Sequence, residues 1–93
     1  MTVLEVEILM EIHQELEKPC PNLNRVYFKW TGPTFELFSL AIVNLKKKGL
    51  INIPKGNIIY GGDKYHPEDV ILDNISVTVK GRMLIEKYKK WFS

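Results

Sequence analysis

Few side chains in this sequence have the types and spacing that metal binding would require. Asp63, His66, Glu68 and Asp69 lie close together in the chain, and all carry atoms that bind metals. A polar loop that turns at Pro67 has the same composition without any metal, because such residues are ordinary in solvated loops. We therefore expect no metal site in this segment.

The candidates for nucleophilic or phosphate chemistry are also isolated. Cys20 lies between two prolines without an identifiable base, and it does not form a zinc-ligand pattern with His13 and His66. Gly61-Gly62 is followed by an aspartate rather than by a helix with lysine and serine, so it is a turn and not a phosphate-binding loop. We predict that the protein is not an enzyme and uses no cofactor.

Basic residues are better candidates for a functional surface. The formal net charge is +2, but residues 1–24 carry five acids and one lysine, whereas residues 25–60 carry six bases and one acid. The resulting segment charges are −4 and +5, and residues 61–93 add +1. A basic middle region suits contact with DNA phosphates, although the solvated end of a helix has the same composition.

Three of these bases, Lys46, Lys47 and Lys48, end a helix predicted over residues 34–48. Its apolar residues recur at three- and four-residue steps and form one buried face: Phe35, Phe38, Ala41, Ile42 and Leu45. Either Thr34 or Thr31 can cap its start, and Gly49 can take the left-handed conformation that ends a helix.

An earlier helix is predicted from Thr2, where Thr2 and Glu5 form a capping-box pair, to the prolines at 19 and 21. Its buried stripe is Leu4, Ile8, Leu9, Ile12 and Leu16, and its predicted water-facing residues are Glu7, Glu11, Gln14 and Lys18. Residues 22–30 fit either a short helix or a strand, and we choose the helix because a glycine turn and a second helix follow.

Residues beyond Gly49 favour strands at 50–53, 58–60 and 75–78, with a turn at 54–57 and a polar loop at 61–69. Residues 70–72 fit a short turn or strand. A last helix follows a Thr78 cap, and Gly81 in its first turn is expected to let helix and strand backbones approach closely. The inward residues predicted for this helix are Leu84, Ile85, Tyr88, Trp91 and Phe92.

The 93 residues are expected to form one domain, residues 1–93. No apolar run approaches the roughly 18 residues of a membrane span, and the N-terminal stripe contains acids that a signal peptide lacks. A single cysteine makes no internal disulfide. We therefore expect a soluble cytoplasmic domain.

Two stretches resemble a known family. Leu-Lys-Lys-Lys-Gly-Leu-Ile at 45–51 looks like the end of the second helix and the start of the wing in winged helix-turn-helix domains. Val-Thr-Val-Lys-Gly-Arg-Met-Leu-Ile-Glu-Lys-Tyr at 77–88 resembles the strand-to-helix junction of the YjcQ-like family, small bacterial and phage proteins without an assigned activity. The resemblance implies an α+β winged helix with a three-helix core, a β-hairpin wing and an extra C-terminal helix.

In such a motif the second helix lies in the DNA major groove, and here that helix is 34–48. The candidate DNA-binding residues on it and on the wing are Thr34, Ser39, Asn44, Lys46, Lys47, Lys48 and Lys55, with Arg25 and Lys29 as further phosphate contacts. The outward face lacks arginine and contains Glu36, so contact with the double-stranded DNA backbone is favoured over sequence reading. The alternative is a protein-interaction or homodimerisation module that uses outward Leu40 and Val43.

Overall fold

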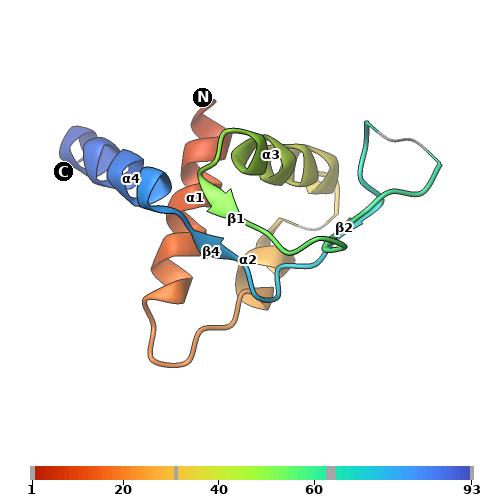
Figure 1. Ribbon diagram of the computed structural model, residues 1–93, viewed down its shortest axis with the longest axis horizontal. Coiled ribbons are helices and arrows are strands. Elements are labelled where there is room, and N and C mark those ends of the chain that lie inside the picture. Colours follow the sequence, from red (N-terminus) through yellow and green to blue (C-terminus); the bar gives the residue numbers. More distant parts are fainter. Residues whose placement is uncertain (1, 31, 63–64, 93) are drawn as a thin grey trace.

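The computed structural model describes residues 2–30, 32–62 and 65–92, with side chains as far as Lys90. Within these residues it contains four helices and two small antiparallel sheets, which confirms an α+β fold (Figure 1). The elements are α1 (Val3–Leu16), α2 (Asn24–Lys29), α3 (Phe35–Lys47), β1 (Ile51–Asn52), β2 (Ile58–Ile59), β3 (Asp69–Val70), β4 (Ser76–Val77) and α4 (Val79–Phe92). The predicted Thr31 cap and the side chains of Trp91 and Phe92 lie outside this description.

The core forms where the apolar stripes of α1 and α3 meet. Its buried residues from these helices are Ile8, Leu9, Ile12, Phe38, Ala41, Ile42 and Leu45, as their spacing predicts. Leu50, Ile51, Val70, Leu72, Ile75 and Ile85 extend the same cluster into the strands and α4. The hydrophobic effect therefore fixes α3 firmly against α1, with one side of α3 left outside the core.

Two of the predicted helix ends are confirmed and one is not. The hydroxyl of Thr2 accepts the N–H of Glu5 at 3.1 Å, which caps α1. Gly49 has φ 72°, and the N–H of Leu50 donates to Leu45 O at 3.0 Å, which ends α3. Thr34 makes no capping bond, because its hydroxyl donates to Trp30 O at 3.1 Å.

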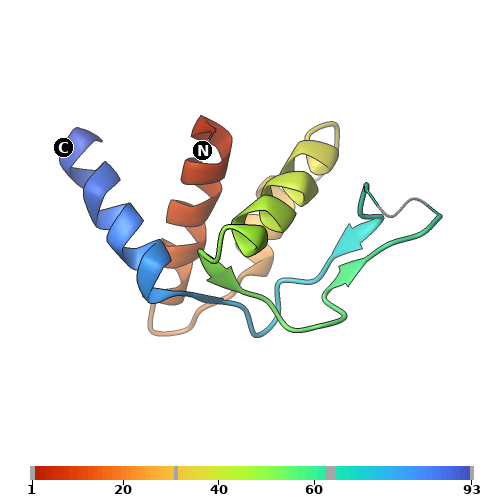
Figure 2. The same ribbon diagram turned by 45° about the horizontal axis from the view of Figure 1, so that its top comes forward.

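The predicted hairpin around residues 54–57 is wrong in its strand pairing. β1 pairs with β4, with Ile51 opposite Val77, and β2 pairs with β3, with Ile58 opposite Val70. Both ladders belong to one long hairpin, in which the β2–β3 ladder lies farther from α4 than the β1–β4 ladder does (Figure 2). Residues 54–57 are a bend within one arm, where the N–H of Asn57 donates to Pro54 O at 3.1 Å.

Asn57 accounts for this arrangement. Its side-chain amide donates to Ile71 O at 2.9 Å and to Asp73 O at 2.7 Å, so it joins the two arms between the short ladders. Lys55 therefore lies at a bend within one arm of the hairpin. The sequence had predicted instead that residues 54–57 close the hairpin.

Gly81 confirms the predicted close approach of helix and strand. A Cβ atom built on Gly81 would lie 2.2 Å from Leu50 O and 2.8 Å from Val77 Cγ1. We expect Gly81→Ala to destabilise the domain by about 1–3 kcal/mol, since the clash with backbone outweighs the roughly 1 kcal/mol that alanine gains in helix propensity. Urea unfolding measures the difference.

Gly62→Ala is the matched control, because no atom lies within 4 Å of a Cβ atom built at that position. Its expected effect is within about 0.5 kcal/mol of wild type. Equal stability of Gly81→Ala and wild type would contradict the close approach.

Candidate nucleic-acid interface

Acidic residues of α1 bind three of the bases that the sequence predicts as phosphate contacts: Arg25, Lys29 and Lys48. Lys48 Nζ donates to Glu5 Oε2 at 2.6 Å, and the Asn44 amide donates to Glu5 Oε1 at 3.3 Å. Burial alone would raise the pKa of Glu5, but the hydrogen bond and charge of Lys48, together with Asn44, hold that pKa below its ordinary value. Two candidate DNA contacts thus stabilise the seam between α1 and α3.

Glu11 was predicted to face water, but its side chain binds the end of α2. Its carboxylate accepts hydrogen bonds from Lys29 Nζ and, at 2.7 Å, from Trp30 Nε1. The bond to Glu11 raises the pKa of Lys29, so this lysine stays charged and paired. A phosphate would have to compete with that carboxylate for Lys29.

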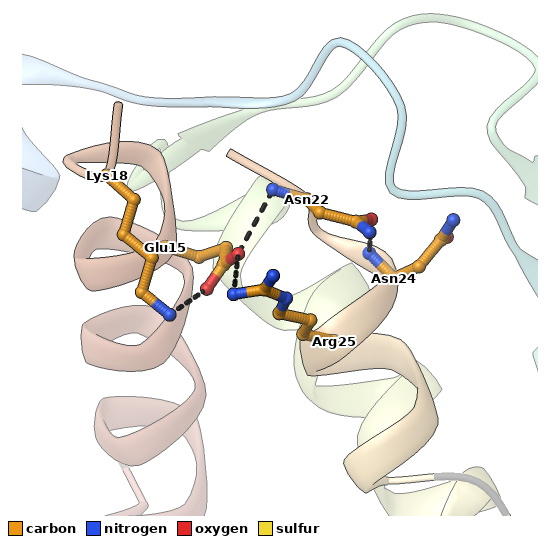
Figure 3. Close-up of polar contacts among 5 residues, drawn as sticks. All are labelled: Glu15, Lys18, Asn22, Asn24 and Arg25. Atoms are coloured by element: carbon orange, nitrogen blue, oxygen red, sulfur yellow. Dashed lines mark hydrogen bonds and ion pairs between the residues drawn. The ribbon is translucent and has the colours of Figure 1, made fainter. Parts of the chain in front are cut away.

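Glu15 is buried close to the start of α2, where it contacts Lys18, Asn22 and Arg25 (Figure 3). Its carboxylate lies 2.7 Å from Lys18 Nζ and 3.9 Å from Arg25 Nη1, and it accepts the N–H of Asn22 at 3.0 Å. The Lys18 hydrogen bond, followed by that of Asn22, lowers the pKa of Glu15. Asn22 Oδ1 in turn accepts the N–H of Asn24 at 3.1 Å, which supports the first turn of α2.

These three contacts show that the uneven charge distribution is partly used for pairing within the chain. Arg25, Lys29 and Lys48, half of the six bases in residues 25–60, are paired with acids of the negative N-terminal segment. The opposite charges of the two segments therefore serve the packing of α1 against α2 and α3. Lys46, Lys47 and Lys55 are exposed and form no ion pair with another described residue.

Ser39 is the candidate residue whose predicted outward position is wrong. Its side chain is 0% exposed, and its hydroxyl donates to Glu36 O at 2.9 Å. That local bond to the preceding turn satisfies the hydroxyl, so burial leaves no unpaired polar group. Thr34, by contrast, is exposed at the start of α3.

The outward face of α3 is partly apolar. Leu40 and Val43 are half-buried rather than fully outward, while Leu37, which we did not assign to this face, is 57% exposed. The helical step could have identified Leu37, because it lies one position from inward Phe38 and outside the stripe.

Lys46 and the hairpin bend border one hollow. A depression of about 480 Å³ lies between the end of α3 and the hairpin, and Lys46, Asn52, Pro54 and Asn74 are among its lining residues. Of the predicted phosphate contacts, Lys46 lines this hollow, and Lys55 is the residue next to its lining residue Pro54.

The outer part of the hairpin returns to the helices. His66 Nε2 lies 3.8 Å from Glu36 Oε1, and the Tyr27 hydroxyl donates to Asp69 Oδ1 at 3.0 Å. This hydrogen bond to a carboxylate raises the pKa of Tyr27. The hairpin is therefore held beside α2 and the start of α3.

The described ranges contain no group of three His, Cys, Asp or Glu residues arranged to hold a metal ion. The predicted cluster in residues 63–69 is only partly covered, because Asp63 lies outside the described residues. Asp69 is bound to Tyr27 and to the N–H of Val70 at 2.8 Å. Cys20 is a free, exposed cysteine.

Known proteins give no family for this chain. No family model, curated protein or solved structure matches it. None of the helices in the described part of the chain has the length and hydropathy that a membrane span requires. The winged-helix resemblance of residues 45–51 and 77–88 remains a prediction.

Proposed function

We propose that this chain is a winged-helix protein that binds the phosphate backbone of duplex DNA through the end of α3 and the hairpin bend. The observation that carries the proposal is the position of Lys46, Lys47 and Lys55: these lysines are exposed and have no acidic partner among the described residues. Lys46 also borders the same hollow as the bend that holds Lys55. Phosphate contact needs exposed positive charge that is not already paired with an acid.

The proposed binding does not select a sequence. The outer face of α3 has no arginine, its Glu36 repels phosphate, and Asn44 is bound to Glu5. Lysines that contact phosphates position a protein without reading bases. We expect similar affinities for duplexes of unrelated sequence.

Replacing Lys47 and Lys55 with glutamine should weaken binding to a short duplex and flatten its salt dependence. Each lost phosphate contact removes about 0.9 from the slope of log K against log salt, so the double variant should lose roughly 2 from that slope. Fluorescence anisotropy at several salt concentrations measures both quantities.

Arg82→Gln/Lys89→Gln is the matched control, because it removes the same charge from exposed positions of α4. It should leave the slope nearly unchanged. Equal losses in both variants would reduce the effect to net charge, and an absence of wild-type binding at low salt would remove the proposal.

The second candidate is a protein-binding role for the outer face of α3. It is favoured by Leu37, which is 57% exposed beside half-buried Leu40 and Val43. An apolar helix face of this kind suits a protein partner better than a DNA groove. Under this reading Leu37→Asp abolishes the capture of a protein partner and leaves DNA titrations unaffected.

A further inference from the structure

A hollow with a basic rim lies where α4 begins beside the turn that ends α3. In both views of the fold, the first turn of α4 lies next to the chain that leads from α3 into β1 (Figures 1 and 2). The hollow has a volume of about 650 Å³. Its described lining is entirely apolar or basic and includes Val79, Met83 and Leu84 together with Lys48, Lys80 and Lys87.

Hydrogen bonds hold the two walls of this hollow together. The Thr78 hydroxyl donates to Gly49 O at 2.7 Å, and the N–H of Thr78 donates to Leu50 O at 3.1 Å. Lys80 Nζ donates to Lys48 O at 2.9 Å across the same junction. A site with fixed walls loses little conformational freedom when a ligand binds, so less of the binding free energy is spent on ordering it.

Val79 and Met83 leave apolar surface uncovered in the hollow. They lie about one helical turn apart on α4, and they are 64% and 69% exposed. Ile85 supplies the buried contact of α4 with the core, so the core does not account for Val79 and Met83. Apolar side chains that gather in a hollow and are bordered by polar residues are typical of binding surfaces.

The rim carries positive charge that the described chain does not neutralise. Neither Lys80 nor Lys87 forms an ion pair with another described residue. The hydrogen bond from Lys80 goes to an uncharged carbonyl oxygen, so that ammonium group keeps its full charge. Lys48 is paired with Glu5 and contributes less. The rim therefore attracts an anionic group, and it does so beside an apolar floor.

We propose that this hollow binds an acidic segment of a partner protein, whose apolar side chains pack on Val79 and Met83 and whose carboxylates lie beside Lys80 and Lys87. A helix with apolar residues three or four positions apart and acids on either side has this composition. It matches both the floor and the charge of the rim, whereas a phosphate backbone matches the charge alone. The inference does not rest on DNA binding, because none of the lysines proposed for DNA contact lines the hollow.

The test is the fluorescence anisotropy of short labelled peptides titrated with the full chain. The first peptide is a helix former with leucines at three- and four-residue steps and glutamates on either side. The second replaces its leucines with serine, and the third replaces its glutamates with lysine. The first peptide should bind, and the other two should bind much more weakly. A first peptide that does not bind would overturn the proposal, and so would a second that binds equally well, since charge alone then explains the binding.

Met83→Ser should weaken binding of the first peptide about tenfold, because the peptide no longer buries that side chain. Met83 is exposed, so circular dichroism should show an unchanged fold. Lys87→Gln should flatten the salt dependence of binding. The matched controls are Val3→Ser, in a separate hollow between α1 and α4, and Arg82→Gln, at an exposed position of α4 outside the lining. Both should bind as wild type does, and equal losses in Met83→Ser and Val3→Ser would contradict the assigned site.

Two further measurements test other occupants of the hollow. Vesicles that contain phosphatidylserine represent a membrane surface, and sedimentation of the chain alone detects a second copy. Vesicle binding or self-association that Met83→Ser abolishes would assign the hollow to that occupant and overturn the proposal. Met83→Ser should leave the affinity for duplex DNA unchanged, so a failure of peptide binding and a failure of DNA binding are separate results.

Discussion

Replacing Phe38 with alanine should destabilise the domain by about 3–5 kcal/mol, the usual cost of removing a fully buried phenylalanine. Phe38 is completely buried, its ring stacks on Trp30 with centroids 6.4 Å apart, and it meets the Tyr27 ring edge-on at 6.5 Å. The loss therefore combines a cavity with two aromatic contacts. Urea unfolding at neutral pH, followed by circular dichroism, measures it.

The loss of the Phe38 side chain should also affect the proposed DNA interface. A domain of this length has a total stability of roughly 5–14 kcal/mol, so the variant should lose a large fraction of it. Phe38 joins α3 to the aromatic rings of Tyr27 in α2 and of Trp30 at its C-terminal end. We expect the lysines at the end of α3 to lose their fixed position with respect to the hairpin as the core loosens.

Phe28→Ala is the control for aromatic truncation. Phe28 is 69% exposed on α2 and meets the Tyr27 ring edge-on at 5.6 Å. Its removal should cost less than about 1.5 kcal/mol, which is the upper range for one aromatic pair. A loss for Phe38→Ala that is no larger than for Phe28→Ala would contradict the assigned core.

The sequence predicted local features well, because local geometry decides them. The stripe that contains Phe38 and Ile42 follows from helix periodicity, and the ends at Thr2 and Gly49 follow from the backbone groups that a helix leaves unpaired. The use of Gly81 followed from its placement at a strand-to-helix junction. In each case neighbours within a few residues carry the information.

Strand pairing could not be predicted in the same way. Pro54, Gly56 and Asn57 are residues of tight turns, and Gly56 has φ 94°, so the turn itself is present. Whether a turn closes a hairpin or bends one arm depends on partners elsewhere in the chain. Here Asn57 binds carbonyls 14 and 16 residues away, and this long-range contact assigns the turn to one arm.

The candidate site differs most from its prediction, because ion pairs, like strand pairs, join residues far apart in the sequence. Glu5 and Lys48 are 43 residues apart, and only the packing of α1 on α3 brings them together. The opposite charges of residues 1–24 and 25–60 were visible in the sequence. Such charges fit pairing within the chain as well as binding to an external partner. The positions of the α1 acids decide between these interpretations for Arg25, Lys29 and Lys48.

Replacing Glu15 with glutamine should lower stability at neutral pH, and the difference from wild type should shrink in acid. The pKa of Glu15 is lowered from 4.5 in the folded chain, first by the Lys18 hydrogen bond and then by that of Asn22. The unfolded chain therefore takes up the proton at a higher pH than the folded chain does. The stabilisation is complete above about pH 4.5 and is lost as the pH falls through the lowered pKa.

Glutamine keeps the size of the side chain and an oxygen that can accept from Asn22, but it removes the charge that Lys18 and Arg25 face. Urea midpoints measured at several pH values should converge for the two proteins as Glu15 becomes protonated. Glu17→Gln is the control, because Glu17 is exposed. Among the described residues its ion-pair partner is His13, whose Nε2 lies 3.5 Å from Glu17 Oε1. Parallel curves for Glu15→Gln and wild type at all pH values would mean that the buried carboxylate does not stabilise the junction of α1 and α2.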